Sequence, residues 1–258
     1  MAYRFTHTAI SIGLIFILFL LSACSNTYEP LPEALEALAS TDAVEVYQVP
    51  VDAWEDDPYY VFQPKSTEPV TGFIFYPGAF VDPRAYAPPA KVLAEAGFLV
   101  VIVKMPNDFA ELGWDRADTV MSDFSDITTW AIGGHSMGGK MGCKYLRERR
   151  YPGNIPGVIL WASRPSNDYR LDSTDITALS IYGTNDGIVT APILEESRQH
   201  LPDDTVWVEI TGGNHTQFGY YDTSPDPVQR NDNPADITRA EQQTIITAET
   251  IDFLLLLQ

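Results

Sequence analysis

Short apolar runs alternate with helix-like segments along most of this 258-residue sequence, and this alternation constrains the fold more than any other feature. Several of the predicted strands are apolar at every position rather than at every second one, as expected of strands that are covered on both faces. Strands of this kind separated by helices build a mainly parallel sheet with helices on both sides. We therefore predict an α/β fold, with a single domain over residues 44–258.

The expected elements follow from apolar runs and from Gly and Pro at their ends. The predicted strands are residues 44–49, 59–62, 70–76, 98–105, 129–133, 157–161, 179–182 and 206–210. The predicted helices are residues 83–96, 117–124, 136–150 and 192–200, followed by a C-terminal helix that begins at the capping-box residues 238–241. Ligands of such sheets bind beyond the carboxyl ends of the strands, so functional residues should follow strands.

The N-terminal residues 1–23 are not expected to belong to the folded domain. Arg4 precedes an apolar run over residues 9–21, which is short for a membrane span. The small residues before Cys24 resemble a bacterial lipoprotein signal, which implies lipidation of Cys24 and export to a bacterial membrane, the outer one in a Gram-negative cell. An ordinary secretory signal is the alternative. Residues 24–43, with two prolines, are predicted to be a tether.

Charge and cysteine content exclude some functions. The chain has 35 acidic and 16 basic residues, giving a formal charge of −19. This argues against nucleic acid as a partner and against membrane binding through protein charge, so a membrane contact is expected only through the lipid anchor. If Cys24 carries lipid, Cys143 has no disulfide partner, and its apolar helical surroundings predict a small buried hydrophobe.

Ser136 lies in the sequence Gly134-His-Ser-Met-Gly138, between a predicted strand and a predicted helix. A serine held on so sharp a turn needs neighbours without a Cβ atom, and Gly134 and Gly138 meet this need. In this context the sequence resembles the α/β-hydrolase superfamily, most closely its small bacterial members without a cap, which are dienelactone-hydrolase-like and esterase-like. The resemblance extends from about residue 71 to the C-terminus.

The resemblance implies a catalytic triad in the order Ser, Asp or Glu, His. His215 directly follows the predicted strand 206–210 and is the expected general base; His135 and His200 are placed less well. Asp186 follows the strand 179–182 and is the expected acid, although Asp also favours turns for its own reasons.

An oxyanion hole requires two backbone N–H donors. Met137, directly after the nucleophile, is expected to supply one, and Ala79 the other, with Phe80 as an alternative to Ala79. Phe80, Trp161 and Lys104 are weaker candidates for lining the substrate site. A core position is the more common one for a large aromatic side chain such as Trp161, and a side chain that reaches solvent from the strand end is the favoured alternative for Lys104.

The sequence contains no metal-ligand spacing, phosphate-binding loop or dinucleotide glycine pattern, so we expect no metal and no cofactor. Residues 162–178 are too few for a cap domain, and the loop 218–236 could partly cover the site. The prediction is a serine hydrolase, a carboxylesterase that cleaves small esters through an acyl-enzyme. The alternatives are an acyltransferase, thioesterase or peptidase with the same triad, or a tethered binding protein whose site has decayed. The oligomeric state is not predicted.

Overall fold

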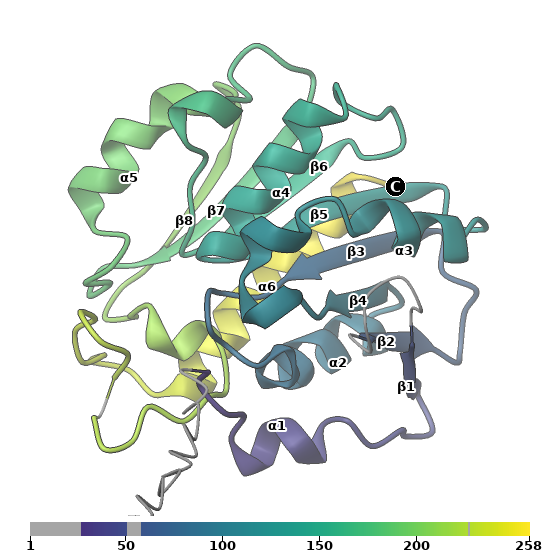
Figure 1. Cartoon of the computed structure of the whole chain (residues 1–258), viewed down its shortest axis with the longest axis horizontal. Helices are drawn as coiled ribbons and strands as arrows, with labels where there is room; N and C mark the ends of the chain where they lie inside the picture. Colours follow the sequence, from purple (N-terminus) through teal and green to yellow (C-terminus); the bar gives the residue numbers. More distant parts are fainter. Residues whose placement is uncertain (1–26, 51–57, 227) are drawn as a thin grey trace, which may run out of the picture.

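The computed structural model describes residues 27–50, 58–226 and 228–258. Within these residues the chain forms an eight-stranded sheet in the order β1-β2-β4-β3-β5-β6-β7-β8 (Figure 1). Strands β4, β3 and β5 to β8 run parallel, and β1 and β2 pair antiparallel at one edge. The strands are β1 Val44–Val49, β2 Tyr59–Pro64, β3 Thr71–Tyr76, β4 Leu99–Val103, β5 Thr129–His135, β6 Gly157–Trp161, β7 Thr177–Gly183 and β8 Val206–Ile210. The predicted α/β fold with a mainly parallel sheet is confirmed.

The helices lie on both faces of this sheet. The α-helices are α1 Pro32–Glu36, α2 Ala87–Glu95, α3 Ala117–Asp123, α4 Met137–Glu148, α5 Ala191–Ser197 and α6 Arg239–Leu256. Short 3-10 helices are η2 Pro83–Tyr86, η3 Pro106–Asp108, η4 Ala110–Gly113, η5 Asn167–Tyr169, η6 Arg198–His200 and η7 Thr216–Phe218. Between β6 and β7 the structure contains only η5 and irregular segments, so no cap domain is inserted there.

The apolar core lies on both faces because successive strand residues point to opposite sides. In β3, Phe73 and Phe75 pack with α2 and α6, whereas Ile74 and Tyr76 pack with α3 and α4. Every residue of β3 is therefore buried, which explains why its sequence is apolar without alternation. Cys143 lies on the buried face of α4 and is part of the core, and burial raises the pKa of its thiol to about 12, as expected of an unreactive buried cysteine.

The capping box at the start of α6 is confirmed. The Thr238 hydroxyl accepts a hydrogen bond from the backbone N–H of Glu241, and the Glu241 carboxylate accepts one from the backbone N–H of Thr238. Ile246 and Phe253 of α6 are buried in the core, and Leu257, just after the helix, packs against it. The cap and this apolar face hold α6 against β7, β8 and the 3-10 helix η7 that follows His215.

Part of the segment predicted to be a tether packs against the domain. Tyr28 pairs with Val81, and Pro30 pairs with Tyr221. The rings of Tyr28 and Tyr221 are 5.5 Å apart, and Ala34 in α1 is fully buried. These contacts hold residues 27–38 on the domain surface. The predicted signal and Cys24 lie outside the described residues, and none of the helices that the structure describes combines the length and apolar character required of a membrane span.

Candidate active site

Ser136 lies at the turn between β5 and α4 with φ 52° and ψ −118°. This left-handed region is uncommon for a residue with a Cβ atom and stores backbone strain. A Cβ atom on either Gly134 or Gly138 would lie 1.9 Å from the carbonyl oxygen of Tyr76, the last residue of the neighbouring strand β3. Both glycines are therefore required by the same close approach, which is the physical basis of the motif found in the sequence.

The backbone of Ser136 is tied to the end of β6. Its N–H donates to the carbonyl of Trp161 at 2.9 Å, and its carbonyl accepts a hydrogen bond from the Ser163 hydroxyl at 2.5 Å. Ser163 is buried and was not predicted from the sequence. The only sequence signal for it is its position just after the predicted strand 157–161.

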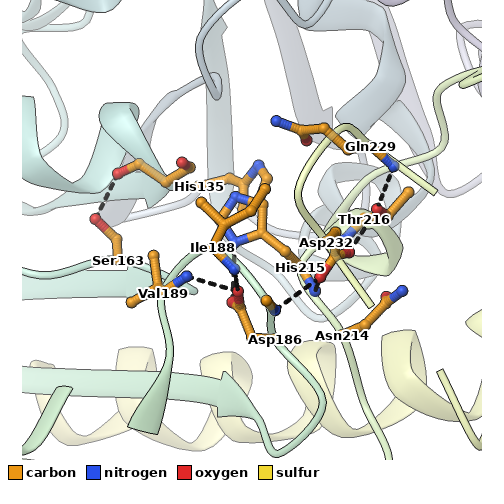
Figure 2. Close-up of polar contacts among 12 residues, drawn as sticks. His135, Ser163, Asp186, Ile188, Val189, Asn214, His215, Thr216, Gln229 and Asp232 are labelled. Carbon is orange, nitrogen blue, oxygen red and sulfur yellow. Dashed lines mark hydrogen bonds and ion pairs between the residues drawn. The ribbon is translucent and has the colours of Figure 1, made fainter. Parts of the chain in front are cut away.

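Asp186 and His215 form a buried hydrogen-bonded pair at the ends of β7 and β8 (Figure 2). The His215 Nδ1 atom lies 2.9 Å from Asp186 Oδ2, and both side chains are fully buried. Because the Asp186 carboxylate can only accept, Nδ1 donates the hydrogen and Nε2 is left with a lone pair. The Nε2 atom is buried and forms no hydrogen bond with any residue that the structure describes. This is the arrangement that a general base requires.

The second oxygen of Asp186 is held by its own turn. Oδ1 accepts hydrogen bonds from the backbone N–H groups of Ile188 at 2.8 Å and Val189 at 2.7 Å. These donors fix the carboxylate so that Oδ2 faces the imidazole. Asp186 can therefore form its turn and also contact His215, because Oδ1 accepts the hydrogen bonds of the turn and Oδ2 faces the imidazole.

Asp232 holds the two loops of this pair together, and it was not predicted. One carboxylate oxygen accepts hydrogen bonds from the N–H of Gly187 at 3.0 Å and from the N–H of His215 at 3.3 Å. The other accepts from the N–H and hydroxyl of Thr216 at 2.7 and 2.6 Å. A single carboxylate thus connects Gly187, the residue after Asp186, with His215.

The ring of His135 connects the elbow to the acid–base pair. Its centroid lies 4.4 Å from that of His215, and its ring stacks on Phe218. Its Nδ1 lies 2.9 Å from the Tyr86 hydroxyl, which itself accepts a hydrogen bond from the N–H of Gly78. Burial, and then the proximity of His215, lowers the pKa of His135 well below its usual value, so the ring is neutral near pH 7. Neutral Nδ1 can accept from Tyr86, which fixes the loop after β3.

That loop contains the expected oxyanion donors. The N–H of Phe80 donates to the carbonyl of Asp108 at 2.7 Å and is therefore occupied. The N–H of Ala79 forms no hydrogen bond within the described part of the chain, and Met137 is the first residue of α4, where an N–H has no acceptor within the helix. The geometry thus favours Ala79 over Phe80 as the partner of Met137.

A pocket of about 230 Å³ opens beside Ser136. It is lined by Ser136, Met137, Lys140, Ser163, Arg164, Ser166 and Val189. None of the weaker candidates Phe80, Trp161 and Lys104 is among these residues, and for Trp161 a lining role is wrong. Its ring is buried against Phe75 at 4.9 Å, and its Nε1 donates to Thr250.

Phe80 is exposed and contacts Phe109, with ring centroids 5.4 Å apart. Lys104 lies just after β4, where its carbonyl accepts a hydrogen bond from Arg116. Over residues 27–50, 58–226 and 228–258, no group of three or more His, Cys, Asp or Glu side chains is arranged to hold a metal ion.

The fold and the site define an α/β hydrolase, and residues 72–244 match the Alpha/beta hydrolase family, so the chain belongs to that family. No curated protein sequence gives a significant match. The dienelactone hydrolase from Anabaena variabilis ATCC 29413 superimposes with a TM-score of 0.61 at 16% identity, over 83% of this chain and 99% of that chain.

Two esterases are similar in fold. Carboxyl esterase 2 from the mycorrhizal fungus Tuber melanosporum has a TM-score of 0.57 at 14% identity, over 90% of this chain and 91% of that chain. The hyperthermophilic esterase from Pyrobaculum calidifontis has a TM-score of 0.57 at 16% identity, over 87% of this chain and 90% of that chain. At sequence identities this low, the structural similarity is evidence for a shared fold alone.

Proposed function

We propose that this hydrolase is a serine carboxylesterase that cleaves small esters through an acyl-enzyme. The observation that carries the proposal is the position of Ser136 on a strained turn, next to His135, whose ring contacts the imidazole of the His215–Asp186 pair. The structural neighbours named as esterases and as a dienelactone hydrolase support the same reaction class.

In the proposed reaction, the Ser136 hydroxyl oxygen attacks the ester carbonyl carbon while His215 Nε2 takes the hydroxyl proton. The carbonyl oxygen becomes an oxyanion that accepts hydrogen bonds from the N–H groups of Met137 and Ala79. The bond to the alcohol then breaks, and the alcohol leaves with the proton from His215. A water molecule repeats the sequence on the acyl-enzyme and releases the acid.

Asp186 stabilises the imidazolium that forms in each half-reaction and keeps Nε2 directed at its target. The N-terminus of α4 adds a positive partial charge near the oxyanion. Loss of one oxyanion donor costs about 3–4 kcal/mol of transition-state stabilisation. The chemistry as proposed uses only groups of this chain and water.

The experiment compares Ser136→Ala with the wild type on p-nitrophenyl acetate and butyrate. We expect kcat to fall at least about a thousandfold, because no other group replaces the nucleophile. Ser173→Ala, an exposed serine outside the pocket, is the matched control and should retain full activity. Wild-type rates in Ser136→Ala would refute the proposal.

Two further measurements separate the alternatives with the same fold. Rates on matched esters, thioesters and amides identify a thioesterase or peptidase, and an added alcohol acceptor reveals acyl transfer. A fluorophosphonate probe labels Ser136 in a working hydrolase and leaves a decayed binding protein unlabelled.

We further propose export and a lipid anchor at Cys24, on the basis of the sequence alone. Metabolic labelling with a fatty-acid analogue should label the wild type and Cys143→Ser, since Cys143 is buried, and should not label Cys24→Ser. A label that persists in Cys24→Ser would contradict the anchor.

A further inference from the structure

The pocket beside Ser136 is positively charged. Lys140 and Arg164 line it, and none of the acidic side chains in the described part of the chain does. This is unexpected in a chain with 35 acidic and only 16 basic residues. The balance of charged side chains at this pocket is therefore the reverse of that in the whole chain.

Neither cation is neutralised by a carboxylate of the residues that the structure describes. Within the described residues, Lys140 and Arg164 form no ion pair, whereas several other arginines are paired with a carboxylate: Arg84 with Asp82, Arg149 with Asp118, Arg170 with Asp172 and Arg198 with Glu195. Both side chains are half-buried rather than exposed. Their charge is therefore available to a bound group at a partly desolvated position, where it counts for more than at an open surface.

The nucleophile turn fixes the backbone from which both cationic side chains extend. Lys140 lies one turn into α4, and its N–H donates to the carbonyl of Ser136. Arg164 directly follows Ser163, whose hydroxyl donates to that same carbonyl. A third polar group, the hydroxyl of Ser166, is buried at the pocket and forms no hydrogen bond with the part of the chain that the structure describes.

We propose that this pocket binds a carboxylate of the substrate, so that the enzyme prefers esters that carry a negative charge a few bonds from the ester carbonyl. The proposal rests on the proposed function and names its substrate class. A guanidinium can hold a carboxylate through two parallel hydrogen bonds, and an ammonium adds a point charge. The pocket of about 230 Å³ is smaller than the roughly 300 Å³ at which sites for drug-sized ligands begin, which suits a short chain.

The net charge of −19 disfavours the approach of such a substrate, and local cations offset this effect. An anionic ester is repelled by the field of the whole protein, and the positive charge at the site opposes that repulsion. A neutral ester gains nothing from Lys140 and Arg164. The distinction between charged and uncharged esters of equal size therefore tests the proposal directly.

The experiment uses two pairs of nearly isosteric esters, followed by acid release in a pH-stat. Monomethyl succinate and methyl butyrate differ by a carboxylate on the acyl side. The butyrate ester of glycolic acid and ethyl butyrate differ by a carboxylate on the alcohol side. Whichever charged ester is preferred by the wild type shows which side of the substrate occupies the pocket.

For that ester we expect Arg164→Gln to lower kcat/KM about tenfold or more, with a smaller loss in Lys140→Gln, because each removes a charged partner. The loss on the neutral ester should be at least about fivefold smaller than the loss on the charged ester, and titration of Ser136 with a fluorophosphonate shows that the variants fold. Lys144→Gln is the matched control: it removes the same charge one turn further along α4, from a side chain that lies over Trp114.

Equal losses on charged and neutral esters, or no preference by the wild type, would overturn the carboxylate proposal while leaving the esterase proposal intact. Hydrolysis of methyl butyrate by Ser136→Ala at the wild-type rate would instead overturn the esterase proposal.

Discussion

The two halves of the candidate site are held in place by different forces. The nucleophile turn is fixed by close packing of backbone: Gly134 and Gly138 both lie against the carbonyl of Tyr76. The acid–base half is fixed by polar contacts across loops, in which Asp232 receives hydrogen bonds from Gly187, His215 and Thr216. The first half is specified by five consecutive residues, and the second by residues far apart in the sequence.

This difference determines how each half should respond to substitution. A backbone clash in the nucleophile turn has no flexible side chain to relieve it, so the response should be abrupt. The contacts of Asp232 are several and partly redundant, so their loss should be graded. The predictions below test this contrast, beginning with the largest expected effect.

Gly138→Ala should cost about 3 kcal/mol or more in free energy of unfolding, because the new Cβ atom would lie 1.9 Å from a backbone oxygen. Esterase activity should fall at least about a hundredfold, since the turn must move and misplace Ser136. Urea unfolding and kcat measure the two effects.

Gly153→Ala is the matched control, since nothing lies within 4 Å of a Cβ atom built there. Its stability should stay within about 0.5 kcal/mol of the wild type. Full activity in Gly138→Ala would show that the turn is not held by packing.

Asp232→Asn should produce a smaller, graded loss. An amide group in place of one carboxylate oxygen brings an NH₂ group near the backbone N–H groups that now donate to it. We expect the free energy of unfolding to fall by about 1.5–3 kcal/mol. We also expect kcat to fall about tenfold with KM nearly unchanged, since His215 loses its orientation while the pocket remains.

Rates should be counted per site titrated with a fluorophosphonate, which excludes unfolded protein from the comparison. Asp236→Asn is the control: Asp236 lies in the same loop and is exposed, and its carboxylate accepts from the Asn185 side chain. If the two variants have the same kcat, Asp232 does not position His215.

The sequence was sufficient for the fold and for where each element of the site should begin. Fully apolar strands predicted a covered parallel sheet, and the strand ends before Ser136, Asp186 and His215 pointed to one edge. The sharp turn at Ser136 could also be inferred from Gly134 and Gly138, because both glycines lie within the same five residues as the serine. These arguments succeed where a single segment contains the whole cause.

They fail where the cause is a contact between distant loops. Asp232 lies in a polar loop with several other Asp and Asn residues, and no local pattern distinguishes it from them. Trp161 ends a strand at the correct edge, but the pleat directs its ring into the core with Phe73 and Phe75. Strand order predicts the edge of the sheet and leaves open on which face a side chain lies.

The two halves of the site meet at His135, which belongs to the nucleophile turn by sequence and contacts His215 by its ring. Its pKa is lowered in the folded state, mainly by burial, so between that pKa and about 6.5 the unfolded chain binds a proton that the folded chain does not. The free energy of unfolding should therefore fall as the pH drops below about 6.5, with a slope of up to about 1.4 kcal/mol per pH unit from this residue.

His135→Gln removes this titration while keeping an oxygen that can accept from Tyr86, so the slope between pH 6.5 and 5 should become shallower. Part of the pH dependence of the free energy of unfolding should remain, because burial also lowers the pKa of His200. His200→Gln should therefore also make the slope shallower. Urea unfolding across this pH range measures both. An unchanged slope in His135→Gln would mean that His135 binds its proton equally well in the folded and unfolded chains, so that the ring between the two halves is a cation in the folded enzyme at the lower end of this pH range.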